Sequence, residues 1–506
     1  MYKTQSALNK CEVFNPSVKH NVFLQTMNLA SQKYEAVIGL EVHARLLTKS
    51  KLFCSDANSY GSEPNENVGV ITLAHPGTLP KTNKKAIEYA VMMGIACNCI
   101  INNKNYFARK HYFYPDLPKG FQTSQHTVPI CGNGFVNIQT STGERNIKLH
   151  HIHLEEDAGK SIHDMDDDYS FIDLNRAGTP LIEIVTEPDM HSAEEAGLLV
   201  TELRKLVRWI NVCDGNMEEG SMRCDANVSI RLKGETKLGT KVEVKNLNSI
   251  RNVRKAIEFE IDRMVNLLEK GERIYQQTRS FDAGNDTTFA IREKEEANDY
   301  RYFPEPDLPP LNLTDEYIID IKNKLPALPQ QLVKKYQQEF ELNTYDASQL
   351  TLEKDIADYF ESVIQHTDNY KAVANWINGP IKQLMNDSSI SLNQIPANKL
   401  AEIINIVDKD EVSFSNASSK LLPAVIKDNF ATVAALAVQL NIIQTKNTDE
   451  LNEWVTTVLN KMPDKVADYK KGKKGLMGLF VGEVKKLSKG KADLKAVTQL
   501  LEQELN

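Results

Sequence analysis

Apolar and polar residues alternate with a period of two near the start of the chain. In the segment 36–46, Glu41, His43 and Arg45 occupy one set of alternating positions, and the other set is apolar. Because successive side chains of a strand point to opposite faces, this pattern predicts a strand with one apolar and one charged face.

The segment 223–232 repeats the pattern, and 241–245 continues it after a turn at 233–235. So short a connection predicts an antiparallel hairpin. Its polar face carries Arg223, Asp225, Asn227, Ser229, Arg231, Lys241, Glu243 and Lys245. A solvated sheet face remains the simpler interpretation of alternation alone, since antiparallel sheets commonly have one.

Helical spacing of apolar residues predicts helices over 84–96, 193–210 and 252–270. A proline-rich passage at 303–310 predicts an extended linker, and the chain beyond about 325 has helical periodicity almost throughout. These patterns predict an α+β catalytic part with an antiparallel sheet, followed by all-helical parts.

The same patterns give domain boundaries. Residues 1–33 lack periodicity and are predicted to be a disordered leader. The strand-rich part is expected at 34–325, a first helical domain at 326–409, and a helical tail domain at 410–506.

Two segments concentrate ionisable residues. The segment 180–185 is apolar on both faces except at Glu183, which predicts a buried carboxylate that needs an Arg, a Lys or a metal ion beside it. The segment 150–157 holds three histidines and three carboxylates. Its adjacent Glu155 and Glu156 would point to opposite faces of a regular strand, so only one can face a given site unless a bulge intervenes.

Carboxylates with few cysteines suit a hard cation such as Mg²⁺, and Arg or Lys on the same face suits phosphate binding. The constellation indicates phosphoryl transfer, with a structural ion-pair network as the alternative. The chain contains neither a P-loop nor a Rossmann fingerprint, and no G-x-S-x-G motif. Any nucleotide must be held by another scaffold, and glutamine hydrolysis in this chain is not expected.

Composition limits the setting. The chain has 506 residues, a net charge of −8 and seven cysteines without a disulfide spacing, and we find no apolar run long enough to span a membrane. A reduced, cytoplasmic protein of about three domains is expected. The net charge of the whole chain argues against nonspecific nucleic-acid binding. The charge of one region points the other way.

The region 461–495 holds eleven lysines against four acidic residues, which makes it +7 and the rest of the chain −15. Gly475, Gly478 and Gly482 follow helical spacing there and would permit close approach of a partner. Helix packing is the simpler explanation and is compatible with such an approach.

Several long motifs resemble the B-type subunit of the aspartyl/glutamyl-tRNA amidotransferases. They are IGLEVH at 38–43, YFYPDLPKGFQ at 112–122, LEEDAGK at 154–160, DLNRAGTPLIE at 173–183, EEGSMRCDANVS at 218–229, KNLNS at 245–249 and NDYRYFPEPD at 298–307. The resemblance runs from about residue 34 to the C-terminus.

This resemblance implies an ATP-dependent carbon–nitrogen ligase with a cradle similar to the glutamine synthetase and guanido-kinase fold. Such a protein phosphorylates the side-chain carboxylate of Glu-tRNA(Gln) or Asp-tRNA(Asn), and ammonia then displaces the phosphate. The implied cofactors are ATP and Mg²⁺. The implied partners are an amidase subunit that supplies ammonia from glutamine, a small third subunit of the heterotrimer and the misacylated tRNA. No membrane partner is implied.

The motif match also implies residue roles. Glu41, His43, Glu156 and Glu183 resemble the family's metal positions and are the predicted catalytic residues. Glu155 and Asp225 resemble either members of a second metal site or residues that contact the metal ligands. Candidate phosphate contacts are Arg176, Arg223 and Lys245, with structural salt bridges as an equal alternative for each.

The tail resembles a tRNA-binding module, and Lys471, Lys473, Lys474 and Lys485 are its candidate contacts. One departure from the family concerns zinc. Many members carry C-x-C and C-x-x-C pairs near the start of the cradle, whereas this chain has only Cys54 there. One thiolate cannot make a structural zinc site, so no zinc is expected.

Two other functions remain open from the residues. A ligase acting on a free carboxylate metabolite would need neither the basic tail nor the helical extension. A noncatalytic RNA-binding scaffold would not need the grouped carboxylates.

Overall fold

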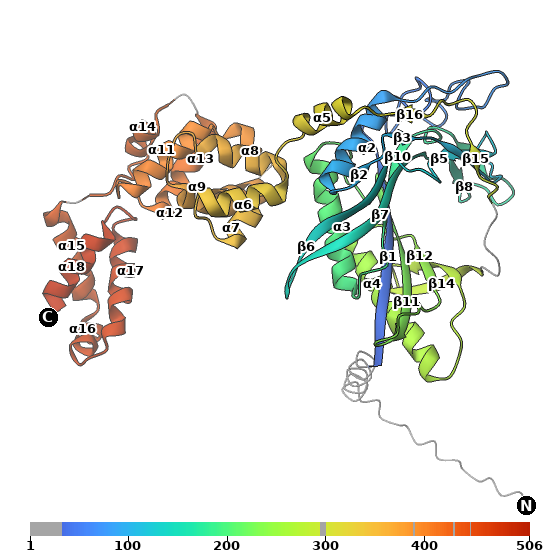
Figure 1. The fold of residues 1–506 in the computed structure, drawn as a ribbon. Coiled ribbons are helices and arrows are strands. Elements are labelled where there is room, and N and C mark those ends of the chain that lie inside the picture. The colour runs from blue at the N-terminus through green and yellow to red at the C-terminus, as the bar shows by residue number, and fades with distance from the viewer. Residues whose placement is uncertain (1–32, 294–299, 388–389, 429–430, 446, 506) are drawn as a thin grey trace, which may run out of the picture. The chain divides into compact units, whose positions relative to one another are not determined.

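The computed structural model describes residues 33–293, 300–387, 390–428, 431–445 and 447–505. The chain forms two compact units, Met1–Leu328 and Pro329–Asn506, and Figure 1 shows the elements of each. The predicted leader lies, apart from Lys33, outside the described residues. The division near 409, predicted inside the helical part, stays a prediction.

A twelve-stranded sheet organises the first unit, and its main path runs β14-β13-β12-β11-β1-β10-β7-β5-β4-β15, with β6 beside β7 and β2 beside β6. Only β12 and β13 pair in parallel among these strands. The strands are β1 (Tyr34–Arg45), β2 (Ile100–Ile101), β4 (Ala108–His111), β5 (Phe121–Ser124), β6 (Cys131–Thr140), β7 (Gly143–Glu156), β10 (Pro180–Thr186), β11 (Met222–Leu232), β12 (Val242–Lys245), β13 (Gln277–Asp282), β14 (Thr287–Glu293) and β15 (Phe303–Pro304).

Two small antiparallel sheets accompany it. One joins β3 (Lys104–Asn105) to β16 (Leu311–Asn312), and the other joins β8 (Lys160–Ile162) to β9 (Phe171–Asp173). The predicted hairpin is confirmed, because β11 and β12 pair antiparallel. The coarse prediction of an α+β fold with a mainly antiparallel sheet is confirmed with it.

Three helices cover the apolar side of the sheet (Figure 1). They are α2 (Lys84–Ala96), α3 (Ala193–Trp209) and α4 (Ile250–Glu269), within two residues of the predicted bounds. Helix α4 packs on β11, α3 on β6 and β1, and α2 on β7. Ile38, Val42 and Ala44 of β1 are fully buried beneath them. Burial of such a face favours folding by about 25 cal/mol per Å² of apolar surface.

The alternation of β1 therefore decides which face is free. Its apolar residues pack beneath the helices. Glu41, His43 and Arg45 are only half-buried on the other face. The charged face is thus left to line a cavity.

The proline-rich passage is extended but does not act as a linker. Phe303 and Pro304 pair with β4, and the Glu305 amide donates to the Phe107 carbonyl at 2.9 Å. Helix α5 (Asp315–Lys324) then packs on α2. Backbone pairing and the buried carboxylate of Glu305 join the passage to the sheet, which proline content alone did not indicate.

The second unit is helical in its described residues. It comprises α6 (Pro329–Glu339), α7 (Thr344–Leu350), α8 (Lys354–Val363), α9 (Tyr370–Trp376), η1 (Ile377–Ile381), α10 (Lys382–Asp387), η2 (Leu392–Gln394), α11 (Ala397–Asp408), α12 (Phe414–Asn416), η3 (Ala417–Leu421), α13 (Leu422–Lys427), α14 (Val433–Gln439), α15 (Thr448–Lys461), α16 (Pro463–Lys470), η4 (Lys474–Leu476), α17 (Met477–Leu487) and α18 (Leu494–Leu505). None of the helices among the described residues has the length and hydrophobicity of a membrane span.

Candidate active site

The charged face brings together residues that are far apart in sequence. In the sheet register, His43 of β1 lies opposite Glu183 of β10 on one side and Arg223 of β11 on the other. Glu41 lies opposite Asp225 in the same way. These side chains share the face that the helices do not cover, which the alternation had indicated.

The first donor group consists of His43, Glu155 and Glu183, whose ligand atoms lie within 4.8 Å of one another. His43 Nε2 is 3.2 Å from Glu183 and 3.6 Å from Glu155. His153 Nε2 lies 3.5 Å from both carboxylates. The predicted cationic partner of Glu183 is therefore a pair of histidines rather than an Arg or a Lys.

The charges of this group depend on one another. Burial lowers the pKa of His43, but the hydrogen bond and charge of Glu183 outweigh it and raise that pKa to about 9. Burial likewise disfavours an ionised Glu183, yet the charge of His153 and contact with His43 hold its pKa well below the usual range. Glu183 and the two histidines therefore stabilise one another's charged forms.

The second donor group consists of Glu41, Asp225 and Glu243, again within 4.8 Å. Burial and the neighbouring charges of Glu183, Glu243 and Asp225 raise the pKa of Glu41, against the hydrogen bond that Asn227 donates to it at 2.9 Å. Three carboxylates this close carry excess negative charge, and a bound cation would relieve it.

Cations stand on the same face. Arg223 Nη2 is 3.0 Å from Asp157, and Lys245 Nζ is 2.6 Å from Asp225 and 2.9 Å from Glu243. Both line a cavity of about 800 Å³ together with the two donor groups. Arg176 does not line this cavity; its Nε is 3.3 Å from Asp157, and its side chain donates to the Ala158 and Gly159 carbonyls.

Glu156 lies on the other side of β7. Its neighbour Glu155 faces the donor group, whereas Glu156 forms an ion pair with Lys119 and accepts from the Thr123 amide at 2.8 Å. The structure therefore does not bring Glu156, expected as a metal position, to either donor group. The regular alternation of the strand is the reason.

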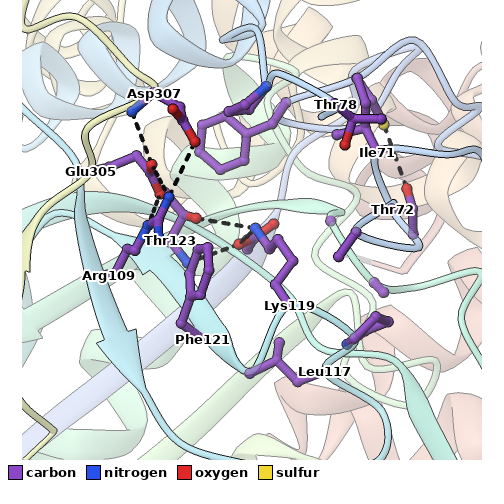
Figure 2. A pocket seen from close by; sticks show the side chains of 18 of the residues that line it. Ile71, Thr72, Thr78, Arg109, Leu117, Lys119, Phe121, Thr123, Glu305 and Asp307 are labelled. Carbon is purple, nitrogen blue, oxygen red and sulfur yellow. Dashed lines mark hydrogen bonds and ion pairs between the residues drawn. The ribbon is translucent and has the colours of Figure 1, made fainter. Parts of the chain in front are cut away.

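Glu156 and Lys119 line a smaller cavity of about 270 Å³. Figure 2 shows Lys119 reaching toward Thr123, and Arg109 reaching toward Glu305 and Asp307, in this cavity. Arg109 donates to Glu305 at 2.7 and 2.8 Å and to Asp307 at 3.2 Å. The charged side chains named here are thus paired with one another.

Cys54, where the family's zinc-binding cysteines would begin, lies in a small hydrogen-bonded network. Asp56 Oδ2 accepts from the Gly69 amide at 2.7 Å and from the Thr72 hydroxyl at 2.6 Å. Cys54 Sγ lies 3.6 Å from the Thr72 hydroxyl. One thiol with hydroxyl and carboxylate neighbours does not fit a structural zinc site, and the absence of zinc stays a prediction.

The tail lysines are exposed. Lys471, Lys474 and Lys485 have no carboxylate partner among the described residues, while Lys473 pairs with Asp468 at 3.0 Å. Lys474 lies over the Tyr469 ring, 4.2 Å from its centroid.

Three glycines of the tail have no close packing partner among the described residues. A methyl group added at Gly475, Gly478 or Gly482 would meet no described atom within 4 Å. Close packing against another part of this unit therefore does not account for their spacing among the described residues.

Three participants were missed as site residues. Glu243 completes the second donor group, and its place on the polar face of 241–245 was the available signal. His153 supports the first group, and the run of three histidines was its only sign. Asp157 pairs with both Arg176 and Arg223, and only its place in the acidic run 155–157 marked it.

Two family profiles match most of the chain. The profile of the GatB/GatE catalytic domain matches residues 36–319, and that of the GatB domain matches residues 358–505. The chain therefore belongs to the GatB/GatE family.

Curated relatives sharpen the placement. A protein of Thermodesulfovibrio yellowstonii is 45% identical over 93% of this chain and 98% of its own length. One of Persephonella marina is 45% identical over 94% of this chain and 100% of its own length. One of Oleidesulfovibrio alaskensis is 46% identical over 94% of this chain and 99% of its own length. Each is named as the B-type subunit of an aspartyl/glutamyl-tRNA(Asn/Gln) amidotransferase.

Proposed function

We propose that the chain is the kinase and transamidase subunit of a tRNA-dependent amidotransferase. It would use ATP to phosphorylate the side-chain carboxylate of Glu-tRNA(Gln), Asp-tRNA(Asn) or both, and ammonia would then replace the phosphate. The observation that carries this proposal is the juxtaposition of two three-residue donor groups with Arg223 and Lys245 in one cavity.

The donor sets fit Mg²⁺. Five carboxylates and one imidazole suit a hard divalent cation better than a thiophilic one. We assign His43, Glu155 and Glu183 to one ion and Glu41, Asp225 and Glu243 to another. Mg²⁺ held there would neutralise charge on the phosphate oxygens. Glu156 is left out of both sets on this assignment.

The chain's own cations would act on the substrate phosphates. Lys245 and Arg223 are held by carboxylates on the cavity wall, so their positions are fixed before a phosphate arrives. An anionic phosphate can share these cations because Arg and Lys donate several hydrogen bonds each. Catalysis would then rest on positioning and charge neutralisation, since phosphoryl transfer asks little covalent chemistry of the protein.

A glutamine synthetase or guanido-kinase type of cradle is consistent with a mainly antiparallel sheet bearing carboxylates on one face. The remaining parts of the proposal concern partners. The relatives' name describes one subunit of an enzyme, so we propose a heterotrimer with a small third subunit and an amidase that releases ammonia from glutamine. The exposed tail lysines Lys471, Lys473, Lys474 and Lys485 would contact tRNA phosphates. A cytoplasmic location fits this role.

The test is an amidation assay with Glu-tRNA(Gln) and Asp-tRNA(Asn), each with ATP, glutamine and the partner subunits. Amide formation that depends on ATP and on this chain supports the proposal, with free glutamate and free aspartate as control substrates. Equal amidation of the free amino acids would instead indicate a metabolite ligase. Wild-type assembly that forms no amide with either tRNA would contradict the proposal.

A further inference from the structure

Two segments place three tyrosines beside one another, and two of these tyrosines line the cavity of about 800 Å³ that holds both donor groups, called here the carboxylate cavity. Tyr112 and Tyr300 both line the cavity. Their ring centroids lie 6.3 Å apart at an interplanar angle of 70°, and the Tyr300 and Tyr302 centroids lie 6.1 Å apart at 74°. Lys110 Nζ lies 4.9 Å from the Tyr300 centroid and also lines the cavity.

The backbone fixes the position of these tyrosines. The His111 amide donates to the Tyr300 carbonyl at 3.0 Å, and β15 continues the pairing with β4 directly afterwards. Arg301, between two of the tyrosines, adopts a left-handed φ of 44°. Such a conformation is uncommon for a residue other than glycine and costs free energy, so the chain is held in this turn by its surroundings.

The tyrosines adjoin the first donor group. Burial and then the charge of Glu155 raise the pKa of Tyr112 above its usual value. Burial, Tyr300 and the charges of Glu155 and Glu183 raise the pKa of Tyr302 to about 12. Both phenols therefore stay protonated at neutral pH and can donate a hydrogen bond beside a site that otherwise presents charges.

Flat, partly apolar rings suit the binding of a nucleobase when the same cavity offers groups that could bind its phosphates, such as Arg223 and Lys245. Stacking of a base on an aromatic side chain contributes about 1–3 kcal/mol and needs no particular base edge. Both substrates of the proposed reaction carry an adenine ring, ATP as its base and tRNA as its 3′-terminal nucleoside. Either one has to place its reacting group near the donor groups, within reach of these rings.

We propose that Tyr112 and Tyr300 form a binding site for an adenine ring in the carboxylate cavity. The proposal rests on the proposed function and adds to it the residues that hold a base. The cavity also offers two aliphatic side chains, Leu247 and Ile291. Rings are favoured because a π-face stacks on a base over its whole surface.

The experiment measures steady-state kinetics of the assembled enzyme with its partner subunits, for Tyr300→Leu, Tyr112→Leu and Tyr300→Phe. Leucine keeps apolar volume but removes the ring, and phenylalanine keeps the ring. We expect each leucine variant to raise KM for one adenine-bearing substrate about 10-fold, with kcat changed less than threefold. That fold-change corresponds to about 1.4 kcal/mol, within the stacking range. Tyr300→Phe should stay within threefold of wild type.

Two arms identify the source of the adenine. A rise in KM for ATP, without a change in inhibition by inorganic tripolyphosphate, assigns the site to the base of ATP. A rise in KM for the misacylated tRNA alone assigns it to the 3′-terminal adenosine. Tyr275→Ala, at an exposed tyrosine outside the cavity, is the matched control and should change neither constant.

The proposal is overturned if both leucine variants keep both KM values within twofold of wild type. It is also overturned if Ile291→Ala, and not the tyrosine variants, raises KM, or if Tyr300→Phe loses as much as Tyr300→Leu. Wild-type enzyme without ATP-dependent turnover would refute the proposed function instead, so the two failures are distinguishable.

Discussion

The two sides of β7 differ in how their charges are balanced, although adjacent residues of the same strand supply both. Glu155 faces a cavity in which two groups of acidic and histidine side chains converge. Glu156 faces a cavity in which Lys119 pairs with it and Arg109 pairs with Glu305. In the Glu155 cavity the three carboxylates of the second donor group share one lysine, Lys245, so a further cation would be favourable there, whereas Glu156 has Lys119 as its own partner. On the proposed assignment, the Glu155 cavity binds metal ions, whereas the ion pairs of the Glu156 cavity stabilise the fold.

The largest effect is expected from loss of a donor on the Glu155 side. Glu155→Gln or Glu183→Gln removes one negative charge from a three-residue group, so the remaining ligands hold Mg²⁺ and its phosphate load poorly. We expect ATP-dependent amidation to fall by about 10³-fold or more, as loss of a major electrostatic contribution does. Initial rates with saturating tRNA measure this.

Glu187→Gln is a matched control, since it alters a glutamate just beyond β10 that lines neither cavity. Circular dichroism and thermal unfolding show whether each variant is folded. Wild-type turnover by folded Glu183→Gln would remove the first donor group from the proposed mechanism.

A smaller effect, of a different kind, is expected on the Glu156 side. Glu156→Gln leaves Lys119 without its charged partner in a largely buried position, and this should destabilise the first unit by about 1–3 kcal/mol. The double variant Glu156→Gln/Lys119→Met removes both charges and should recover part of that loss. Urea unfolding measures the stability. No coupling between the two substitutions would mean that the ion pair contributes nothing.

The tail lysines should affect binding rather than chemistry. Replacing Lys471, Lys473 and Lys474 with alanine is expected to raise KM for misacylated tRNA about 10-fold at moderate salt. Each lost phosphate contact reduces the salt dependence by about one unit of slope. Lys473 should contribute least, because it already pairs with Asp468. Unchanged KM values for tRNA would show that the basic tail does not bind it.

The smallest effect is expected at Gly482 inside α17. Alanine would meet no described atom within 4 Å there and should stabilise the helix by about 0.5–1 kcal/mol. If the glycine instead gives tRNA access to the helix backbone, the same variant should raise KM for tRNA a few-fold while raising the melting temperature. A higher melting temperature with an unchanged KM would exclude a binding role for the glycine.

Local patterns predicted much of the fold. The alternation in β1 and β11, and the helical spacing of α2, α3 and α4, gave elements and faces because side-chain periodicity depends only on nearby residues. The proline-rich passage was misjudged, since its pairing with β4 joins residues about two hundred positions apart, as the Phe303–Arg109 pair shows.

Site membership was harder to predict for the same reason. The motif match favoured Glu156, but the register of β7 with β10 puts His153 opposite Glu183 and Glu155 opposite Leu181, so Glu155 and not Glu156 shares the face of Glu183. Glu243 had the right alternation, but only the pairing of β11 with β12 brings it to Asp225 and Glu41. Strand order and register, and not residue type alone, decide which carboxylates come together.

The most direct test of this account compares Glu155→Gln and Glu156→Gln in tRNA-dependent ATP cleavage, with ammonium chloride supplied in place of glutamine. Saturating ATP and misacylated tRNA make the rate report on chemistry. The account predicts that Glu155→Gln loses at least about 10³-fold, as expected for a lost electrostatic contribution, and that folded Glu156→Gln keeps most of the wild-type rate. Loss of ATP cleavage in Glu156→Gln with retention in Glu155→Gln would contradict it.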